Sequence, residues 1–170
     1  MKSPCDGRRI TNIVFVGLGG HGVLKASDIA ATAALLAGFD VKKSELHGMS
    51  QRGGSVSSDV RYGECVLSPM VPPGEADFLV VIAPDQIEVN RWQLREGFGV
   101  LLEPSMIDAE KLENKKSLNV ALLGALSAQA GIAEEYWILA IREHLPPALH
   151  DTNRRAFEIG RNSARTETKL

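Results

Sequence analysis

The chain has 170 residues, of which 44% are hydrophobic and 24% charged, and its formal net charge is −2. This length predicts one globular domain, and the near-neutral charge excludes the strongly basic footprint of a nucleic-acid-binding protein. No apolar run reaches the roughly 18 residues of a membrane-spanning helix, and the N-terminus lacks the apolar core of a signal peptide. The two cysteines, Cys5 and Cys65, form no C-x-x-C motif. We therefore expect a cytoplasmic protein that holds no iron–sulfur cluster or other metal by itself.

The chain opens with the pattern of a strand, a glycine-rich turn and a helix. Residues 12–16 form the apolar run of a buried strand, residues 17–22 read GLGGHG, and a helical apolar period continues to residue 37. The turn fits G-x-G-x-x-G, which places an anion at a helix N-terminus. A dinucleotide site also needs an acidic residue about 20 residues farther on, for which Asp40 and Glu45 are candidates. The alternative is that the glycines only let a helix over 21–37 pack closely on the sheet.

Residues 45–56, with the sequence ELHGMSQRGGSV, contain more polar and charged side chains than a surface turn needs. Each glycine disfavours an ordered chain by about 0.5–1 kcal/mol relative to alanine, so three of them indicate a special backbone or a close approach. An arginine before a glycine pair suits a phosphate or carboxylate, which guanidinium binds in a bidentate fork. The simpler interpretation is a tight loop between two strands. His47 beside Glu45 suggests acid–base chemistry, but no nucleophile is in view, and a structural hydrogen bond explains the pair as well.

The remaining pattern predicts an α/β domain. The expected strands are 55–62, 65–68, 77–82 and 99–102, with a turn at 63–64. The expected helices are 84–95, 118–130, 134–144 and 151–160, and residues 110–116 indicate a solvated connection. We expect a single three-layer domain over residues 1–160, with a mixed, mostly parallel sheet flanked by helices and a start resembling the Rossmann fold. Residues 161–170 have nothing to bury and are expected to fray.

Three segments together resemble a known family: the glycine turn, residues 45–56, and Ser68 with Pro69. They are similar to the gamma-type subunit of thiamine-dependent 2-oxoacid:ferredoxin oxidoreductases, the pyruvate/ketoisovalerate oxidoreductase gamma family. The HGMSQRGG form at 47–54 is most similar to the beta subunit of indolepyruvate ferredoxin oxidoreductase. The resemblance covers nearly the whole chain. His21 departs from the family, which usually has glutamine at that position.

The resemblance implies an accessory subunit that is inactive alone. Complexes of this family convert a 2-oxoacid, here an aryl or other 2-oxoacid, and coenzyme A to acyl-CoA, CO2 and reduced ferredoxin. The resemblance places thiamine diphosphate, magnesium and 4Fe-4S clusters on a large partner subunit, and ferredoxin reaches this chain only through the complex. It leaves open whether coenzyme A touches this chain and whether the isolated chain forms a homodimer. The alternative function is a non-enzymatic nucleotide- or CoA-binding module that self-associates.

The chemistry and the resemblance together predict one contact surface and no catalytic or metal-ligating residue. Its residues are expected to bind a cofactor or contact the partner subunit. They are Gly19, Gly20, His21, Gly22, His47, Ser50, Gln51, Arg52, Gly53 and Gly54.

Overall fold

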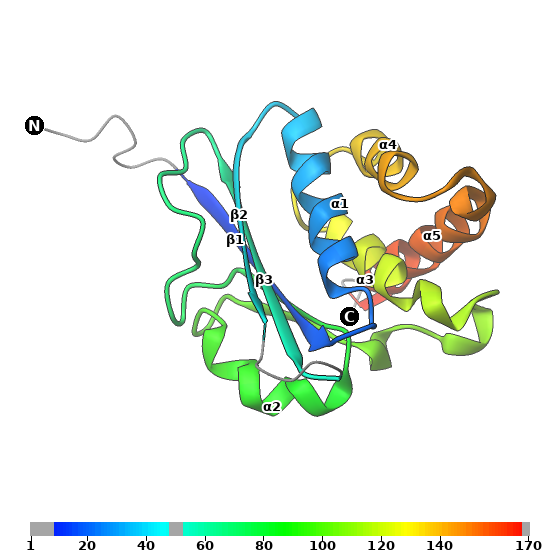
Figure 1. Ribbon diagram of the computed structural model, residues 1–170, viewed down its shortest axis with the longest axis horizontal. Helices are drawn as coiled ribbons and strands as arrows, with labels where there is room; N and C mark the ends of the chain where they lie inside the picture. The colour runs from blue at the N-terminus through cyan, green and yellow to red at the C-terminus, as the bar shows by residue number, and fades with distance from the viewer. Residues whose placement is uncertain (1–8, 48–52, 168–170) are drawn as a thin grey trace, which may run out of the picture.

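The computed structural model describes residues 9–47 and 53–167 of the chain. Its core is a five-stranded sheet in the order β2-β3-β1-β4-β5 (Figure 1). The strands are β1 (Ile10–Leu18), β2 (Asp40–His47), β3 (Ser55–Gly63), β4 (Phe78–Val81) and β5 (Val100–Leu102). The helices are α1 (Val23–Leu36), α2 (Ile87–Asn90), α3 (Leu118–Ser127), α4 (Glu134–His144) and α5 (His150–Glu167). Among the described residues, no helix combines the length and apolarity needed to cross a membrane.

The expected α/β class with a mixed sheet is confirmed, and of the five strands in this sheet β3 alone runs against the other four. β1 is parallel to β4 and β4 to β5, whereas β3 is antiparallel to both β1 and β2. β3 follows residues 40–47, which form β2 although only Val41 and Leu46 among them are apolar. β2 and β3 form a hairpin around the glycine-rich segment, in place of the crossover helix that a parallel sheet would need.

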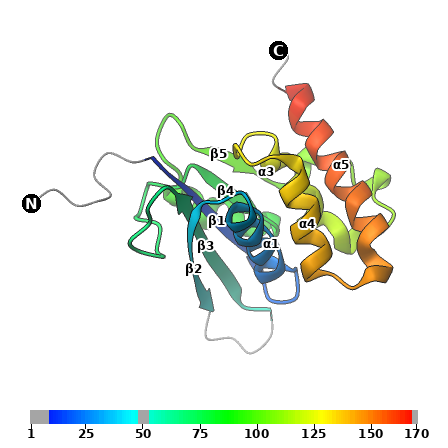
Figure 2. The same ribbon diagram turned by 90° about the horizontal axis from the view of Figure 1, so that it is seen from above.

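The two faces of the sheet are covered very differently. Ile13 and Phe15 of β1 belong to the large core under the long helices, and Val14 and Val16 face a smaller cluster. α1 and α3 lie against the first face, with α4 beside α1 and α5 against α3 (Figures 1 and 2). The second face is covered by short pieces, including Val71, Ile87 and Leu94. The expected third layer of regular helices is therefore largely replaced by an irregular one.

Helices α3 and α5 touch through their backbones. A Cβ atom added to Gly160 would lie 1.7 Å from the carbonyl oxygen of Ala121, and one added to Gly124 would lie 2.0 Å from that of Phe157. Every residue of α3 from Asn119 to Ser127 is buried. The close approach explains why α5 is held along its length. It continues to Glu167, so the helix does not end at Gly160, as the sequence suggested.

Residues 65–68, expected as a returning strand, are irregular because side chains bind their backbone. Asp40 accepts a hydrogen bond from the Val66 amide at 2.8 Å. Arg61 donates to the carbonyl oxygens of Ser68 and Met70 at 3.0 and 3.1 Å. These bonds replace the ladder that a strand would make. They hold the segment over the edge of the second sheet face.

Several other element boundaries also differ from expectation. The helix expected at 84–95 is broken into Pro84–Gln86, α2 and Arg91–Gln93, and the Asn90 side chain donates to the Gln86 carbonyl at 2.8 Å. Side-chain bonding of this kind competes with a continuous helix. Residues 110–116 contain parts of two short 3₁₀ turns, α1 begins at Val23 rather than residue 21, and α3 ends at Ser127.

Tyr62 makes the fold sensitive to alkaline pH. Burial raises the pKa of Tyr62 from 10.0 to about 12, and its hydroxyl donates to the Ala130 carbonyl. A raised folded-state pKa gives stability that is present below pH 10 and lost as pH rises toward 12, by about 2–3 kcal/mol. We expect Tyr62→Phe to be about 1 kcal/mol less stable at pH 8 but to lose less stability above pH 10. Urea unfolding of both proteins between pH 8 and 12 measures this, and parallel pH profiles would contradict it.

Candidate functional site

The glycine turn lies where β1 ends and α1 begins. Gly20 and Gly22 have φ values of 90° and 78°, a left-handed conformation that side chains disfavour. The His21 amide donates to the Leu18 carbonyl at 3.1 Å, which closes the turn. A Cβ on Gly20 would meet nothing within 4 Å. Glycine is therefore required at position 20 by its backbone conformation, and not by a neighbouring backbone as its pattern suggested.

The two glycine-rich segments predicted from the sequence meet in the structure. The Gly19 amide donates to the Gly54 carbonyl at 2.9 Å, and a Cβ on Gly19 would be 3.6 Å from the Gly53 nitrogen. The turn after β1 and the end of the β2–β3 connection therefore form one surface. Three predicted members of that surface, Ser50, Gln51 and Arg52, lie outside the described residues, together with the rest of 48–52.

Asn119 fixes the turn from the other side. Its side-chain amide donates to the Gly22 carbonyl at 3.1 Å, and a Cβ on Gly22 would lie 2.4 Å from the same nitrogen. Asn119 stands in the first turn of α3, 97 residues away in sequence. Gly22 is thus required both for its backbone angle and for the space that Asn119 occupies.

A pocket of about 540 Å³ opens beside the turn. It lies at the carboxyl ends of β1, β4 and β5, the edge at which α/β proteins bind ligands. Its lining combines apolar side chains with two groups that can carry positive charge, His21 and Lys116. The lining residues are Gly20, His21, Gly22, Ile82, Pro84, Pro104, Lys116, Leu118 and Asn119. Only the first three were predicted from the sequence, because the others come from the segments after β4 and β5 and from the start of α3, which are distant in sequence.

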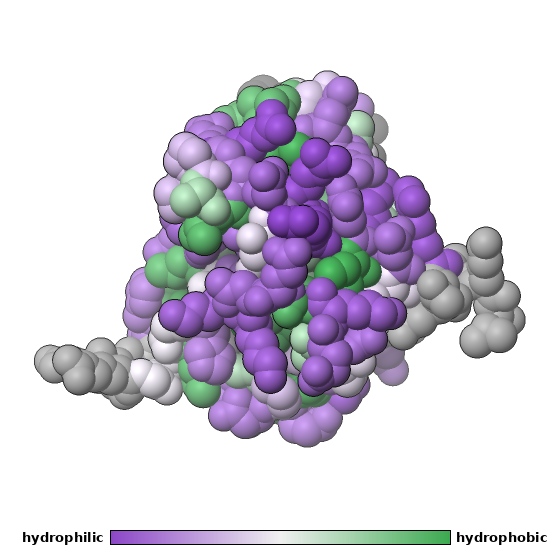
Figure 3. All heavy atoms as spheres, turned by 90° about the vertical axis from the view of Figure 1, so that its right-hand side faces the viewer, coloured by the Kyte–Doolittle hydropathy of each residue, from purple (hydrophilic) through white to green (hydrophobic). Residues whose placement is uncertain are grey.

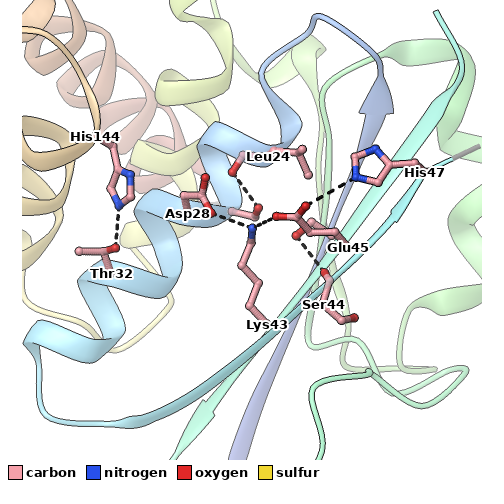
Figure 4. A network of polar contacts seen from close by, with 10 residues as sticks. Leu24, Asp28, Thr32, Lys43, Ser44, Glu45, His47 and His144 are labelled. Atoms are coloured by element: carbon pink, nitrogen blue, oxygen red, sulfur yellow. Dashed lines mark hydrogen bonds and ion pairs between the residues drawn. The ribbon is translucent and has the colours of Figure 1, made fainter. Parts of the chain in front are cut away.

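His47 belongs to a chain of charged contacts between β2 and α1 (Figure 4). The Lys43 ammonium lies 2.7 Å from Asp28 of α1 and also contacts Glu45, which lies 3.6 Å from the His47 ring. The Lys43 hydrogen bond holds the pKa of Glu45 below its usual value. Desolvation opposes charge on Lys43, but its bonds to Asp28 and Glu45 raise its pKa. The His47 ring therefore lies near the Glu45 carboxylate at a distance longer than a hydrogen bond.

This arrangement disfavours a dinucleotide site. Asp40 pairs with Gly63, which pairs with Ile10 at the start of β1, whereas the glycine turn follows Leu18 at the end of that strand. Asp40 is thus at the opposite end of the sheet from the turn. Glu45, the other candidate, is engaged by Lys43. The hairpin β2–β3 also takes the place of the second crossover.

Comparison with known proteins shows the family of the chain. The sequence matches the family described as "Pyruvate ferredoxin/flavodoxin oxidoreductase" over residues 12–163. Indolepyruvate oxidoreductase subunit IorB of Thermococcus kodakarensis is 36% identical, with 91% of this chain and 96% of that one covered.

Two solved structures share the fold. The gamma subunit of the keto/oxoacid ferredoxin oxidoreductase of Geobacter sulfurreducens is 26% identical, with a TM-score of 0.75 and coverage of 93% and 98%. The 2-oxoglutarate:ferredoxin oxidoreductase of Magnetococcus marinus is 20% identical, with a TM-score of 0.80, and this chain covers 32% of that chain. The resemblance to gamma-type subunits is therefore confirmed, and the chain belongs to the pyruvate ferredoxin/flavodoxin oxidoreductase family.

Proposed function

We propose that this chain is the cytoplasmic accessory subunit of a thiamine-dependent 2-oxoacid:ferredoxin oxidoreductase, with indolepyruvate or a related aryl 2-oxoacid as substrate. The single observation that carries the proposal is the contact between Gly19 and Gly54. It joins two of the three segments on which the family resemblance rests into one surface. The similarity to IorB subunits, which extends over nearly their whole length, supports the substrate class.

The redox and carbon–carbon bond chemistry is assigned to the larger subunit. The described residues include no group of three or more histidine, cysteine, aspartate or glutamate side chains that could hold a metal ion. The family resemblance places thiamine diphosphate, magnesium and 4Fe-4S clusters on the larger partner subunit. In the overall reaction, the 2-oxoacid and CoA-SH give acyl-CoA, CO2 and a proton, and two ferredoxins each accept one electron.

The pocket beside the glycine turn suits the phosphate groups of coenzyme A. His21 and Lys116 supply two sites for positive charge, and Ile82, Pro84 and Leu118 supply apolar surface for an attached organic group. The α1 N-terminus has no acidic residue in its first turn and no side-chain cap, so its amide groups favour an anion. The Magnetococcus marinus relative is described with coenzyme A and succinyl-CoA bound. We assign this chain one wall of the CoA site in the assembled complex.

Reconstitution tests the proposal. The isolated chain is expected to contain no stoichiometric iron, to be colourless and to oxidise no 2-oxoacid. Adding the larger subunit of the same organism should give CoA-dependent ferredoxin reduction with indolepyruvate, in proportion to the accessory subunit until a fixed ratio is reached. Iron–sulfur absorbance in the pure chain would contradict the assignment. Coenzyme A binding by the isolated chain without any association with the larger subunit would instead favour the self-associating binding module.

A further inference from the structure

The short helix α2 and the 3₁₀ turn Arg91–Gln93 that follows it expose two large apolar side chains next to each other. Val89 and Trp92 are each 61% exposed. The indole nitrogen of Trp92 donates to the Val89 carbonyl at 3.0 Å, so the polar atom of the ring is already satisfied. The exposed part of Trp92 is therefore hydrocarbon surface that gains nothing specific from water.

The segment 84–94 is anchored on its other side, so this exposure is not a sign of a loose chain. Ile87 and Leu94 pack against the apolar cluster on the second face of the sheet. The segment thus has one apolar side that packs inward on the sheet and another apolar side that faces outward. Two charged side chains of the same segment, Glu88 and Arg91, are paired with each other, because Arg91 donates to Glu88 at 2.8 Å. An apolar centre with paired charges at its border is the composition of a protein interface.

Hydrogen bonds tie α2 to the candidate functional surface. The Ser55 hydroxyl bonds the Gln86 side chain at 3.1 Å, and Asn90 bonds the Gln86 carbonyl at 2.8 Å. Ser55 directly follows Gly54, which accepts the bond from Gly19. Figure 1 shows α2 at the bottom of the molecule, beside the start of β3. The apolar pair therefore continues the surface on which the two glycine-rich segments meet.

We propose that Val89 and Trp92 form the anchor through which this chain binds the larger catalytic subunit. The inference rests on the proposed function, and its occupant follows from position. A partner that completes an active site at the glycine turn must cover the adjoining surface, and Val89 and Trp92 supply exposed apolar area there. In the Magnetococcus marinus relative, a fold like this one makes up 32% of a longer chain, so there such a domain is part of a larger polypeptide. Tryptophan is also among the residues that dominate interface energies.

The helical side of the molecule offers a contrast. Hydrophilic side chains dominate the face that carries α4 and α5, and the apolar ones there form small separate patches (Figure 3). Leu35 at the end of α1 is 62% exposed and Leu67 on the irregular segment is 73% exposed. Both match Trp92 in exposure and lie on other parts of the surface. They provide controls for a general effect of removing exposed apolar area.

The test measures affinity for the larger subunit by titration, using Trp92→Ala, Val89→Ala and the double variant beside Leu35→Ala and Leu67→Ala. We expect Trp92→Ala to raise the dissociation constant at least about tenfold, with Val89→Ala acting in the same direction. The two leucine variants should bind like wild type, and all melting temperatures should stay close to the wild-type value. Turnover at saturating accessory subunit should be unchanged for Trp92→Ala, with only the half-saturating concentration increased.

Three outcomes would overturn the inference. Trp92→Ala and the double variant could bind the larger subunit as tightly as wild type, in complexes that retain full CoA-dependent turnover. Only this anchor would then fail, and the proposed function would stand. Leu67→Ala could weaken binding where Trp92→Ala does not, which would place the partner on the irregular segment. Sedimentation could instead reveal a dimer of the isolated chain that Trp92→Ala dissolves without changing heteromeric affinity, which would make a second copy the occupant.

If the wild-type chain neither binds the larger subunit nor supports turnover, the proposed function fails as well.

Discussion

Gly160→Ala is expected to lower the melting temperature by about 10 °C or more. The new Cβ would lie 1.7 Å from the Ala121 carbonyl oxygen, which is helix backbone and cannot rotate away. Separating α3 from α5 would open the core around Phe157 and Trp137, both fully buried. Overpacking of this kind costs about 3 kcal/mol or more, and each kcal/mol corresponds to about 2–4 °C in a domain of this size. Differential scanning calorimetry of the isolated chain measures the change.

The expected loss of stability is opposite in sign to the usual effect of replacing a helical glycine by alanine. At an open helical position, alanine would stabilise the protein by about 1 kcal/mol relative to glycine. Gly124→Ala should destabilise in the same way as Gly160→Ala, because its Cβ would meet the Phe157 carbonyl. Arg154→Ala on the exposed side of α5 removes only a surface pair with Glu158 and should change stability by less than about 1 kcal/mol. A Gly160→Ala protein that melts at or above the wild-type temperature would show that the two helices are not in backbone contact.

The elements predicted correctly are those whose burial can be inferred from their own residues. β1 and β4 are apolar on both faces because they are buried on both, and α4 has acidic residues in its first turn and basic ones in its last. β2 was missed because Val41 is the one apolar side chain on its inward face. Lys43 faces α1 but is satisfied by Asp28 and Glu45. Such a strand is recognisable only when its partners, which are distant in sequence, are known.

The candidate site likewise contains some residues that the sequence predicted and some that it did not. The glycine turn and the segment around Gly53 and Gly54 were predicted because positive φ values require glycine, which the sequence records directly. Lys116 and Asn119 were not assigned to the site, since they reach the turn only through the packing of α3. The rule that α/β proteins bind ligands at the carboxyl ends of their parallel strands would have indicated this edge of the sheet. It could not have named residues from a helix almost a hundred positions away.

The described residues on either side of 48–52 adjoin the glycine turn or end β2. Gly53, the next residue, has a φ of 68°, and Gly54 is bonded to Gly19 in the glycine turn. On the other side of the connection, His47 is paired with Val56 at the end of β2. Arg52 therefore immediately precedes two residues that belong to the candidate surface. Its side chain suits a phosphate or carboxylate, because guanidinium offers two parallel hydrogen bonds to such a group.

Arg52→Ala is expected to reduce CoA-dependent turnover of the reconstituted complex by about 10- to 150-fold, corresponding to about 1.5–3 kcal/mol for a charge-assisted contact. Arg52→Lys keeps the charge but loses the fork, so it should recover little of that loss. Substituting Ser50 or Gln51, the predicted helpers of Arg52, should have smaller effects in the same direction. Melting of the isolated chain should change little in any of these variants. Arg154→Lys, on the exposed side of α5, serves as the control for an arginine outside the surface. If both Arg52 variants assemble and turn over like wild type at physiological salt, the segment has a structural role only, and the anion contact must be sought at His21 and Lys116 in the pocket.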